Sequence, residues 1–405
     1  MKLNSMVDPD RIRLLILLPG VQLFGQEQAL IGLARLLRTR GIESRFLLHA
    51  GWGNPLAEQL EKEKFDYSLL PMGTLWSIRL MLTEPMSQVG NLWSAMRTTV
   101  ALRRIMKQEN FSHIVLGNST FALYLLPALF NKKIAVVYRH GDEPTLHSWF
   151  HRWMTRILFS RSDRHVTNCW YIAKSILSLF PDADPVVIYN TPARLEPSES
   201  NECATPGADN GAPALRRLLY VGQVAEHKGI LVLLEAFRLL APEFPDVVLD
   251  IVGEIPGVGA CRPLHVANSL NAAVADYPDR IFHHGHQNDV SAYYQRAHLH
   301  ICPSIWQDPS PNVIFEAKQY GLPSVVFNVG GVPELVAHRE DGFICQNISA
   351  SELAAGIRCF LADESLRTQA ALSARQSIGN KFGNQRFIEQ WLEVLRTTGC
   401  VAQNA

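Results

Sequence analysis

Short apolar runs alternate with longer amphipathic stretches in the first half of the chain. The apolar runs cover residues 14–18, 44–49, 114–117 and 134–138, and apolar side chains recur with a helical period over residues 26–40. Strands that alternate with helices in this way favour a parallel sheet with helices on both faces. The pattern therefore predicts a doubly wound α/β domain.

The same rhythm restarts near residue 215. Apolar runs cover residues 218–221, 247–252, 281–283, 299–303 and 325–327, and helical stretches cover residues 230–240, 290–296 and a segment that ends at Tyr320. Between the two halves, residues 196–214 contain almost nothing that a core could bury, as in a linker or a long solvated loop.

The pattern as a whole predicts two Rossmann-like domains, residues 1–190 and 215–380, joined by a linker at residues 191–214. Two such domains facing each other form a cleft, and open α/β sheets bind ligands at the carboxyl ends of their strands. The last segment, residues 381–405, has the apolar stripe of an amphipathic helix. One arrangement for this helix is to pack back on the N-terminal domain.

The composition is that of a soluble globular protein, with 47% hydrophobic and 19% charged residues among 405. No window approaches the ~18 consecutive apolar residues of a membrane-spanning helix, and the apolar run at 14–18 is too short for a secretory signal. The seven cysteines are scattered, without the spacing of a metal site, which favours free thiols in a reducing compartment. We therefore expect a cytoplasmic protein, with a position at the inner face of the membrane left open.

The net charge of zero hides an asymmetry between the two halves. Residues 1–190 contain 22 Lys and Arg against 15 Asp and Glu, whereas residues 191–405 contain 16 against 23. Two basic stretches rich in tryptophan, residues 72–107 and 146–164, lie in the first half, and such helices can lie in a membrane interface. The alternative is that each helix packs on its own sheet. Nothing in the pattern indicates nucleic-acid binding.

A glycine and a lysine follow the strand expected at residues 218–221. Gly222 and Gln223 come directly after this strand, and Lys228 precedes Gly229 at the start of the next helix. A glycine at a strand end lets a ligand approach the backbone, and a lysine nearby can neutralise a diphosphate. A lysine before a glycine is also common at helix starts that bind nothing.

Two carboxylates eight residues apart, Asp308 and Glu316, lie in the segment 302–335. Asn312 between them is a candidate N-cap, which would leave the amides of Val313 and Ile314 free to attract a phosphate. Glu316, about one turn into the helix, could accept hydrogen bonds from a ribose, and Asp308 could hold sugar hydroxyls. The alternative is that Asp308 caps a turn and Glu316 is solvated.

This segment resembles the C-terminal half of the family 4 glycosyltransferases, which have the GT-B fold. The resemblance covers residues 215–375 and is carried, in order, by Gly222, Lys228-Gly229, Pro303-Ser304, Asp308, Glu316-Ala317, Gly321, Pro323, Gly330-Gly331 and Asp341-Gly342. It implies that Lys228 contacts the donor diphosphate, Glu316 the ribose and Asp308 the transferred sugar. The family commonly has Glu at the position of Asp308 and Arg at the position of Gln223, so weaker donor binding is one consequence of these differences.

The N-terminal half resembles the family less closely. Pro19-Gly20 and Gly25, before the expected helix, resemble the glycine-rich loop that approaches the donor and the acceptor. His140, at the end of the strand expected at 134–138, resembles a histidine that contacts the sugar, and we expect it to face the cleft. The alternative is a loop histidine beside Asp142, which would cap the next helix.

The resemblance implies a retaining glycosyltransferase, which moves a sugar from a nucleoside diphosphate sugar to a hydroxyl of a glycan, lipid or other acceptor, in polysaccharide or glycoconjugate biosynthesis. GT-B enzymes generally need no metal, so we expect no cofactor and interpret the Asp-x-Asp motif at residues 182–184 as a surface turn just before a strand. The alternatives are a non-catalytic nucleotide-sugar-binding protein and a GT-B epimerase or phosphorylase.

Overall fold

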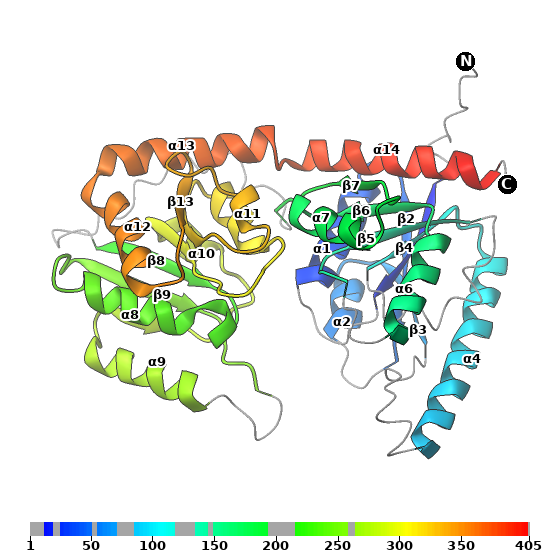
Figure 1. Cartoon of the computed structure of the whole chain (residues 1–405), viewed down its shortest axis with the longest axis horizontal. Coiled ribbons are helices and arrows are strands. Elements are labelled where there is room, and N and C mark those ends of the chain that lie inside the picture. The colour runs from blue at the N-terminus through cyan, green and yellow to red at the C-terminus, as the bar shows by residue number, and fades with distance from the viewer. Residues whose placement is uncertain are drawn as a thin grey trace. The chain divides into compact units, whose positions relative to one another are not determined.

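Both sheets of the molecule are parallel throughout the strands that pair (Figure 1). The computed structural model describes residues 12–18, 25–50, 55–70, 85–117, 134–144, 149–192, 215–257 and 264–403. The chain divides into two compact units, one of Met1–Tyr189 with Asn384–Ala405 and the other of Asn190–Gly383, here called unit 1 and unit 2.

Unit 1 is built on a seven-stranded sheet in the order β3-β2-β1-β4-β5-β6-β7. Its strands are β1 Arg13–Leu18, β2 Glu43–His49, β3 Asp66–Leu70, β4 His113–Leu116, β5 Ala135–His140, β6 Arg164–Thr167 and β7 Pro185–Val187. Its helices include α1 Gly25–Arg38, α2 Pro55–Lys62, α4 Pro85–Gln108, α6 Trp149–Arg161, α7 Trp170–Leu179 and α14 Asn384–Gln403.

The sheet of unit 1 is buried on both faces. Alternate residues of β1 enter different cores: Leu14 and Ile16 join a cluster with α1 and α14, and Leu15 joins a cluster with α6 and α7. In α14, the buried side chains are the apolar stripe expected from the sequence, centred on Trp391. The last helix of the chain is therefore part of the core of unit 1.

Unit 2 is built on a six-stranded sheet in the order β10-β9-β8-β11-β12-β13. The strands are β8 Arg216–Val221, β9 Val247–Val252, β10 Ile281–His283, β11 Leu299–Cys302, β12 Ser324–Phe327 and β13 Gly342–Cys345. Around them lie η2 Glu226–Lys228, α8 Ile230–Leu240, α9 Leu264–Asp276, α10 Ser291–Arg296, α11 Asn312–Gln319, η3 Val332–Glu334, α12 Ala350–Ala362 and α13 Glu364–Asn380. The first strand of this unit, β8, lies inside the sheet, and the chain winds outward in both directions from it, as in a dinucleotide-binding fold.

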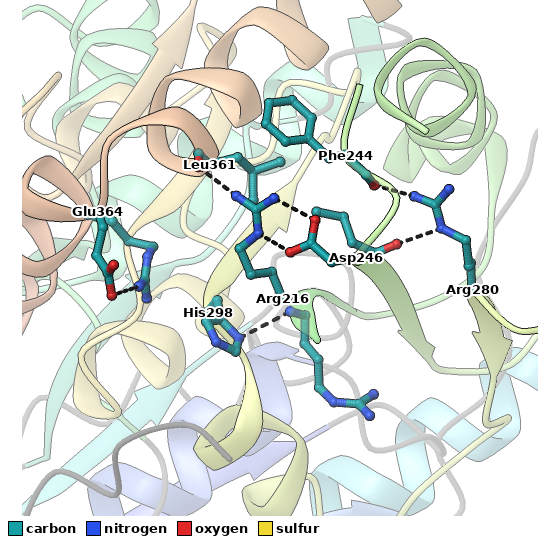
Figure 2. Close-up of polar contacts among 10 residues, drawn as sticks. Arg216, Phe244, Asp246, Arg280, His298, Leu361 and Glu364 are labelled. Atoms are coloured by element: carbon teal, nitrogen blue, oxygen red, sulfur yellow. Dashed lines mark hydrogen bonds and ion pairs between the residues drawn. The ribbon is translucent and has the colours of Figure 1, made fainter. Parts of the chain in front are cut away.

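Arginines secure the amino ends of the strands in unit 2 (Figure 2). Arg216, the first residue of β8, donates to both carboxylate oxygens of Asp246 at 2.5 and 2.6 Å and to the Leu361 carbonyl at 2.6 Å. Arg280 donates to three backbone carbonyls, including that of Phe244 at 2.7 Å. These bonds tie together loops and helices at the edge of the sheet opposite the carboxyl ends of the strands.

The predicted α/β architecture with two doubly wound sheets is confirmed. Three strands, β3, β6 and β13, were not expected from the sequence. Each has only four or five residues and includes polar or glycine positions, so none forms a distinct apolar run. Within the ranges that the structure describes, no helix is long and apolar enough to cross a membrane.

Candidate functional site

The candidate site lies where the neighbouring strands β8 and β11 end. The loop after β8 carries His227 and Lys228, and the loop after β11 carries Ile305 and Trp306, whose amides donate to the His227 carbonyl at 3.1 and 3.2 Å. Parallel neighbours end at the same edge of a sheet. The two loops that the sequence singled out are therefore hydrogen-bonded to each other.

Gly229 allows this contact. Its φ is +77°, and a Cβ on it would lie 1.7 Å from the Pro303 carbonyl oxygen. Any other residue would both adopt a strained backbone and collide with the β11 loop. The glycine after Lys228 is thus required to hold Lys228 against the segment that carries Asp308.

Lys228 and Asp308 form an ion pair, with 2.5 Å between Nζ and Oδ2. The Asp308 side chain is 12% exposed and that of Lys228 is 32% exposed. Two residues 80 positions apart, predicted independently to bind a donor, therefore meet in the structure. The pair holds a cation at the edge of the sheet where α/β proteins bind ligands.

The two adjacent glycines after β12 form hydrogen bonds to the Asp308 loop. Gly331 donates its amide to the Asp308 carbonyl at 3.0 Å, and Gly330 donates to Oε1 of Gln307 at 2.7 Å. Gly330 has φ +53°, and a Cβ there would come within 2.5 Å of the Asp308 carbonyl oxygen. The Gly-Gly motif therefore fixes the backbone that presents the Asp308 carboxylate.

The predicted N-cap role of Asn312 is wrong. The helix α11 is capped by Pro311, whose ψ of 119° is extended, and Asn312 is its first helical residue. Proline suits a helix start because it has no amide hydrogen that would be left unpaired. The Ile314 amide donates to the Pro311 carbonyl at 3.2 Å, so it does not point freely out of the helix as predicted. The Asn312 side chain instead accepts a hydrogen bond from Asn190 at 3.0 Å. Val313, the next residue of the helix, is half-buried.

Glu316 lies one turn into α11 and is half-buried. Its Oε2 accepts a hydrogen bond from the hydroxyl of Tyr294 at 2.9 Å. The carboxylate is therefore held by the protein and is not a solvated helix side chain. Tyr294 was not singled out from the sequence, because it lies 22 residues earlier on another helix.

Gly222 and Gln223 shape the end of β8. The hydroxyl of Tyr220 donates to the Gln223 carbonyl at 2.5 Å. The carbonyl oxygen of Gly222 lies only 1.8 Å from where a Cβ on Gly253 would be, so the β8 and β9 ends pass in close contact. The close approach depends on the missing side chain of Gly253, and the predicted approach of a ligand to the backbone at Gly222 stays a prediction.

Ser310 is a residue of this region that sequence reasoning missed. It lies in the loop between Asp308 and α11, is 8% exposed, and its Oγ has no hydrogen-bond partner among the described residues. A buried hydroxyl without a partner is unfavourable by about 1–3 kcal/mol, which a ligand could relieve. Its position between Pro309 and Pro311 was the only available signal.

The other predicted site residues, Gly25 and His140, belong to unit 1. Gly25 is the first residue of α1, and the Pro19-Gly20 motif lies outside the described residues. His140 is the last residue of β5 and is 3% exposed, with its Nε2 3.1 Å from Nδ1 of His165.

Burial of His140 is the main cause of its lowered pKa. The ring lies against Phe159, with 5.2 Å between the ring centroids. This burial, together with His165 and Arg139, lowers the pKa of His140 well below its usual value of 6.5. His140 is therefore neutral at pH 7, and its contact with a sugar stays a prediction.

The Asp-x-Asp motif is exposed. Asp182 lies in a turn and Asp184 pairs with Arg164 at 3.0 Å, with 84% of its side chain exposed. Across the described part of the chain, no group of three or more His, Cys, Asp or Glu side chains has the arrangement of a metal site.

Two family models match the chain, one in each half. Residues 211–377 match "Glycosyl transferases group 1", and residues 25–191 match "Glycosyltransferase Family 4".

An uncharacterized glycosyltransferase of Haemophilus influenzae is 32% identical over 181 residues, which is 44% of this chain and 49% of that protein. The capsular polysaccharide biosynthesis glycosyltransferase CapM of Staphylococcus aureus is 26% identical over 175 residues, 42% of this chain and 43% of CapM. The chain thus spans about half the length of the curated relatives that it matches.

A solved structure of similar architecture is that of HepE from Anabaena in complex with UDP. The TM-score is 0.75, and the match covers 95% of this chain and 100% of HepE at 18% sequence identity. At this identity the comparison shows the fold alone, a two-domain GT-B fold.

Proposed function

Since the chain belongs to the group 1 and family 4 glycosyltransferases, we propose that it moves a sugar from a nucleoside diphosphate sugar to an acceptor hydroxyl. The observation that carries the proposal is the Lys228–Asp308 ion pair at the carboxyl ends of β8 and β11. It combines a cation for a diphosphate with a carboxylate for sugar hydroxyls, on loops whose backbones are fixed by glycines. UDP is the first nucleotide to test, because HepE was solved with it.

In this proposal each end of the donor has its own contacts in unit 2. Lys228 and the hydroxyl of Ser310 hold the diphosphate near the start of α11, where the positive end of the helix dipole favours an anion. Glu316 accepts hydrogen bonds from the ribose, and Asp308 accepts them from the transferred sugar. Gln223 and Gly222 line the end of β8 beside the diphosphate.

Donor binding exchanges the partners of the ion pair. Lys228 leaves Asp308 for the diphosphate, and Asp308 becomes free to accept hydrogen bonds from the sugar. The pair keeps both side chains oriented before the donor arrives, which reduces the entropy lost on binding. Binding of the diphosphate by Lys228 and orientation of the sugar by Asp308 are thereby coupled.

The transfer step is proposed to retain the anomeric configuration. The bond between the anomeric carbon and the diphosphate oxygen breaks, and the acceptor oxygen bonds to the same carbon from the same face. The acceptor proton passes to the departing diphosphate oxygen. Lys228 stabilises the charge that develops on the leaving group, a type of contribution worth ~10²–10³ in rate. The proposal invokes no metal or other cofactor.

The acceptor is proposed to be a growing glycan or a lipid-linked sugar, in polysaccharide or glycoconjugate biosynthesis. CapM, one of the similar proteins, is named for capsular polysaccharide biosynthesis. The excess of basic residues in the first half suits an anionic acceptor or membrane surface. On α6, Arg152 and Arg156 are exposed beside Trp153, which is 53% exposed, so this helix is the proposed point of membrane contact at the cytoplasmic face.

The test is release of nucleoside diphosphate from UDP-, GDP- and ADP-sugars by the full chain with a panel of glycan and lipid acceptors. We expect Lys228→Ala to lower the rate by at least ~100-fold and Glu316→Ala to raise the donor KM. Lys62→Ala, at an exposed lysine of α2, is the matched control and should retain the wild-type rate.

Full activity of both site variants would contradict the assignment of these residues. Binding of a nucleotide sugar without turnover on any acceptor would instead support a non-catalytic binding protein. Conversion of the donor without an acceptor would support an epimerase.

A further inference from the structure

Tyr294 is a buried tyrosine whose hydroxyl reaches the proposed donor site. Its side chain is 1% exposed, and the hydroxyl donates to Oε2 of Glu316 at 2.9 Å. The ring stacks on Tyr320, which follows α11, with 5.4 Å between centroids and an interplanar angle of 7°. A tyrosine with its ring packed in this way has few alternative rotamers, so its hydroxyl position is well defined.

The helix that carries Tyr294 is anchored to the sheet by a buried carboxylate. Asp250 of β9 is 2% exposed, and its Oδ1 accepts from Arg296 of α10 at 3.1 Å and from His284 at 2.6 Å. Its Oδ2 accepts from Arg217 of β8 at 3.1 Å. A buried carboxylate with several hydrogen-bonded partners disfavours any other position of those partners. The anchor therefore holds α10 at a fixed place on β8 and β9.

The Glu316 side chain has more rotatable bonds than the side chain of Tyr294. The glutamate side chain rotates about three bonds and is half-buried, so fixing it in one orientation costs conformational entropy. The hydrogen bond from Tyr294 meets this cost before any ligand arrives. Because a carboxylate can accept about four hydrogen bonds, the bond from Tyr294 does not by itself exclude bonds from the hydroxyls of a ribose.

We propose that Tyr294 is a positioning residue that orients the Glu316 carboxylate toward the ribose of the donor, and so contributes to selecting ribonucleotides. This inference rests on the proposed function, in which Glu316 is the ribose ligand. The loss of the hydroxyl leaves the ribose contact poorly placed, whereas contacts to the diphosphate and the base are retained.

The experiment is isothermal titration of the full chain with UDP and with 2′,3′-dideoxyuridine diphosphate, or with the GDP or ADP pair where wild type prefers that base. The readout is the Kd for the dideoxynucleotide divided by the Kd for the ribonucleotide. We expect wild type to favour the ribonucleotide by ~10-fold or more, since hydrogen bonds to a charged group are the stronger kind. Glu316→Gln should bring the ratio close to one, and Tyr294→Phe should lower it at least ~3-fold with the dideoxy Kd unchanged.

Tyr277→Phe is the matched control, the same chemical change on a tyrosine of unit 2 that packs on Phe237. It should leave the ratio at the wild-type value. The double variant Tyr294→Phe/Glu316→Gln should show the same ratio as Glu316→Gln alone, because Tyr294 acts through Glu316.

The outcomes separate the two hypotheses. A ratio in Tyr294→Phe equal to that of wild type, with Glu316→Gln bringing it close to one, would overturn the role of Tyr294 and leave the ribose assignment intact. A wild type that binds none of the nucleotides would overturn the proposed function itself. A uniform loss of affinity for both nucleotides in Tyr294→Phe, with a lowered melting temperature, would show a merely structural role and also overturn the inference.

Discussion

At the scale of single residues, the Lys228–Asp308 pair places a positive and a negative side chain next to each other in the proposed site. The carboxylate holds the lysine in place, with 2.5 Å between Nζ and Oδ2, and largely compensates its charge. In the proposed function the carboxylate also repels the diphosphate that the lysine attracts, until the donor replaces Asp308. Asp308 has a shorter side chain than the glutamate expected from the family resemblance. Lys228 nevertheless reaches it.

We predict that Asp308→Asn separates donor binding from transfer. The variant removes a negative charge near the diphosphate, so UDP should bind at least as tightly as to wild type and up to ~10-fold more tightly. The rate of sugar transfer should fall by ~100-fold, because the sugar loses its carboxylate contact. Calorimetric titration with UDP and initial-rate measurements give the two quantities.

Asp276→Asn is the control, since this exposed carboxylate on α9 pairs with Arg238 at 3.4 Å and is not part of the site. A parallel loss of UDP affinity and of rate in Asp308→Asn would contradict the proposed exchange of partners.

The sequence predicted charged residues for the site but not the residues that support them. Spacing and resemblance predicted Lys228, Asp308 and Glu316, and the structure brings the first two together. The N-cap role predicted for Asn312 was wrong because Pro311 is the N-cap and Asn312 is already the first helical residue. Tyr294 could not be found, because its hydrogen bond to Glu316 depends on how α10 and α11 pack, which no local pattern encodes.

At the scale of elements, α14 shows how a segment at the end of the chain completes the core of unit 1. Trp391 is 1% exposed in the cluster that includes β1 and α1. The carbonyl of Leu395 bonds to Nε2 of His113 of β4 at 2.8 Å. The apolar stripe was visible in the sequence, but the histidine contact, between residues 282 positions apart, was not.

We predict that Trp391→Ala destabilises unit 1 by about 3–5 kcal/mol, the usual cost of truncating a buried tryptophan. Glu393→Ala, at an exposed position of the same helix, should change stability by less than about 0.5 kcal/mol. Differential scanning calorimetry compares the unfolding transitions of the two variants. Equal transitions for both would show that α14 contributes little to the core.

Several strands and helices followed their apolar patterns closely. The helix α8 and the strands β9 and β10 begin and end where the sequence predicted. The strand β13, Gly342–Cys345, was not predicted because its four residues include a glycine and show no alternation of apolar and polar positions. It is defined instead by pairing with β12 over four residues, a tertiary interaction.

At the scale of the whole molecule, buried histidines make stability depend on pH. Burial is the largest cause that lowers the pKa of His113, His165 and His298 to about 4, and that of His300 to about 3. These groups take up protons near pH 6.5 when unfolded and only near pH 3–4 when folded. The stability they contribute is therefore fully present above pH 6.5 and is lost as the pH falls toward 4.

We predict that the melting temperature falls steeply between pH 6.5 and pH 4.5. For His113 alone, the shift from 6.5 to about 4 corresponds to roughly 3 kcal/mol across the whole range, at about 1.4 kcal/mol per pH unit. Circular dichroism melts at half-unit pH steps measure the effect, and His113→Gln should show a shallower dependence for unit 1. A melting temperature that stays constant from pH 7.5 to pH 5 would contradict this prediction.

The central claim is that unit 2 binds a nucleoside diphosphate sugar through Lys228, and titration calorimetry of the full chain with UDP, GDP and ADP tests it most directly. We predict one site with a preference for one of the three bases, and an affinity at least ~10-fold lower in Lys228→Ala. No binding of any of the three nucleotides to the wild-type chain, or equal affinity in Lys228→Ala, would contradict the account.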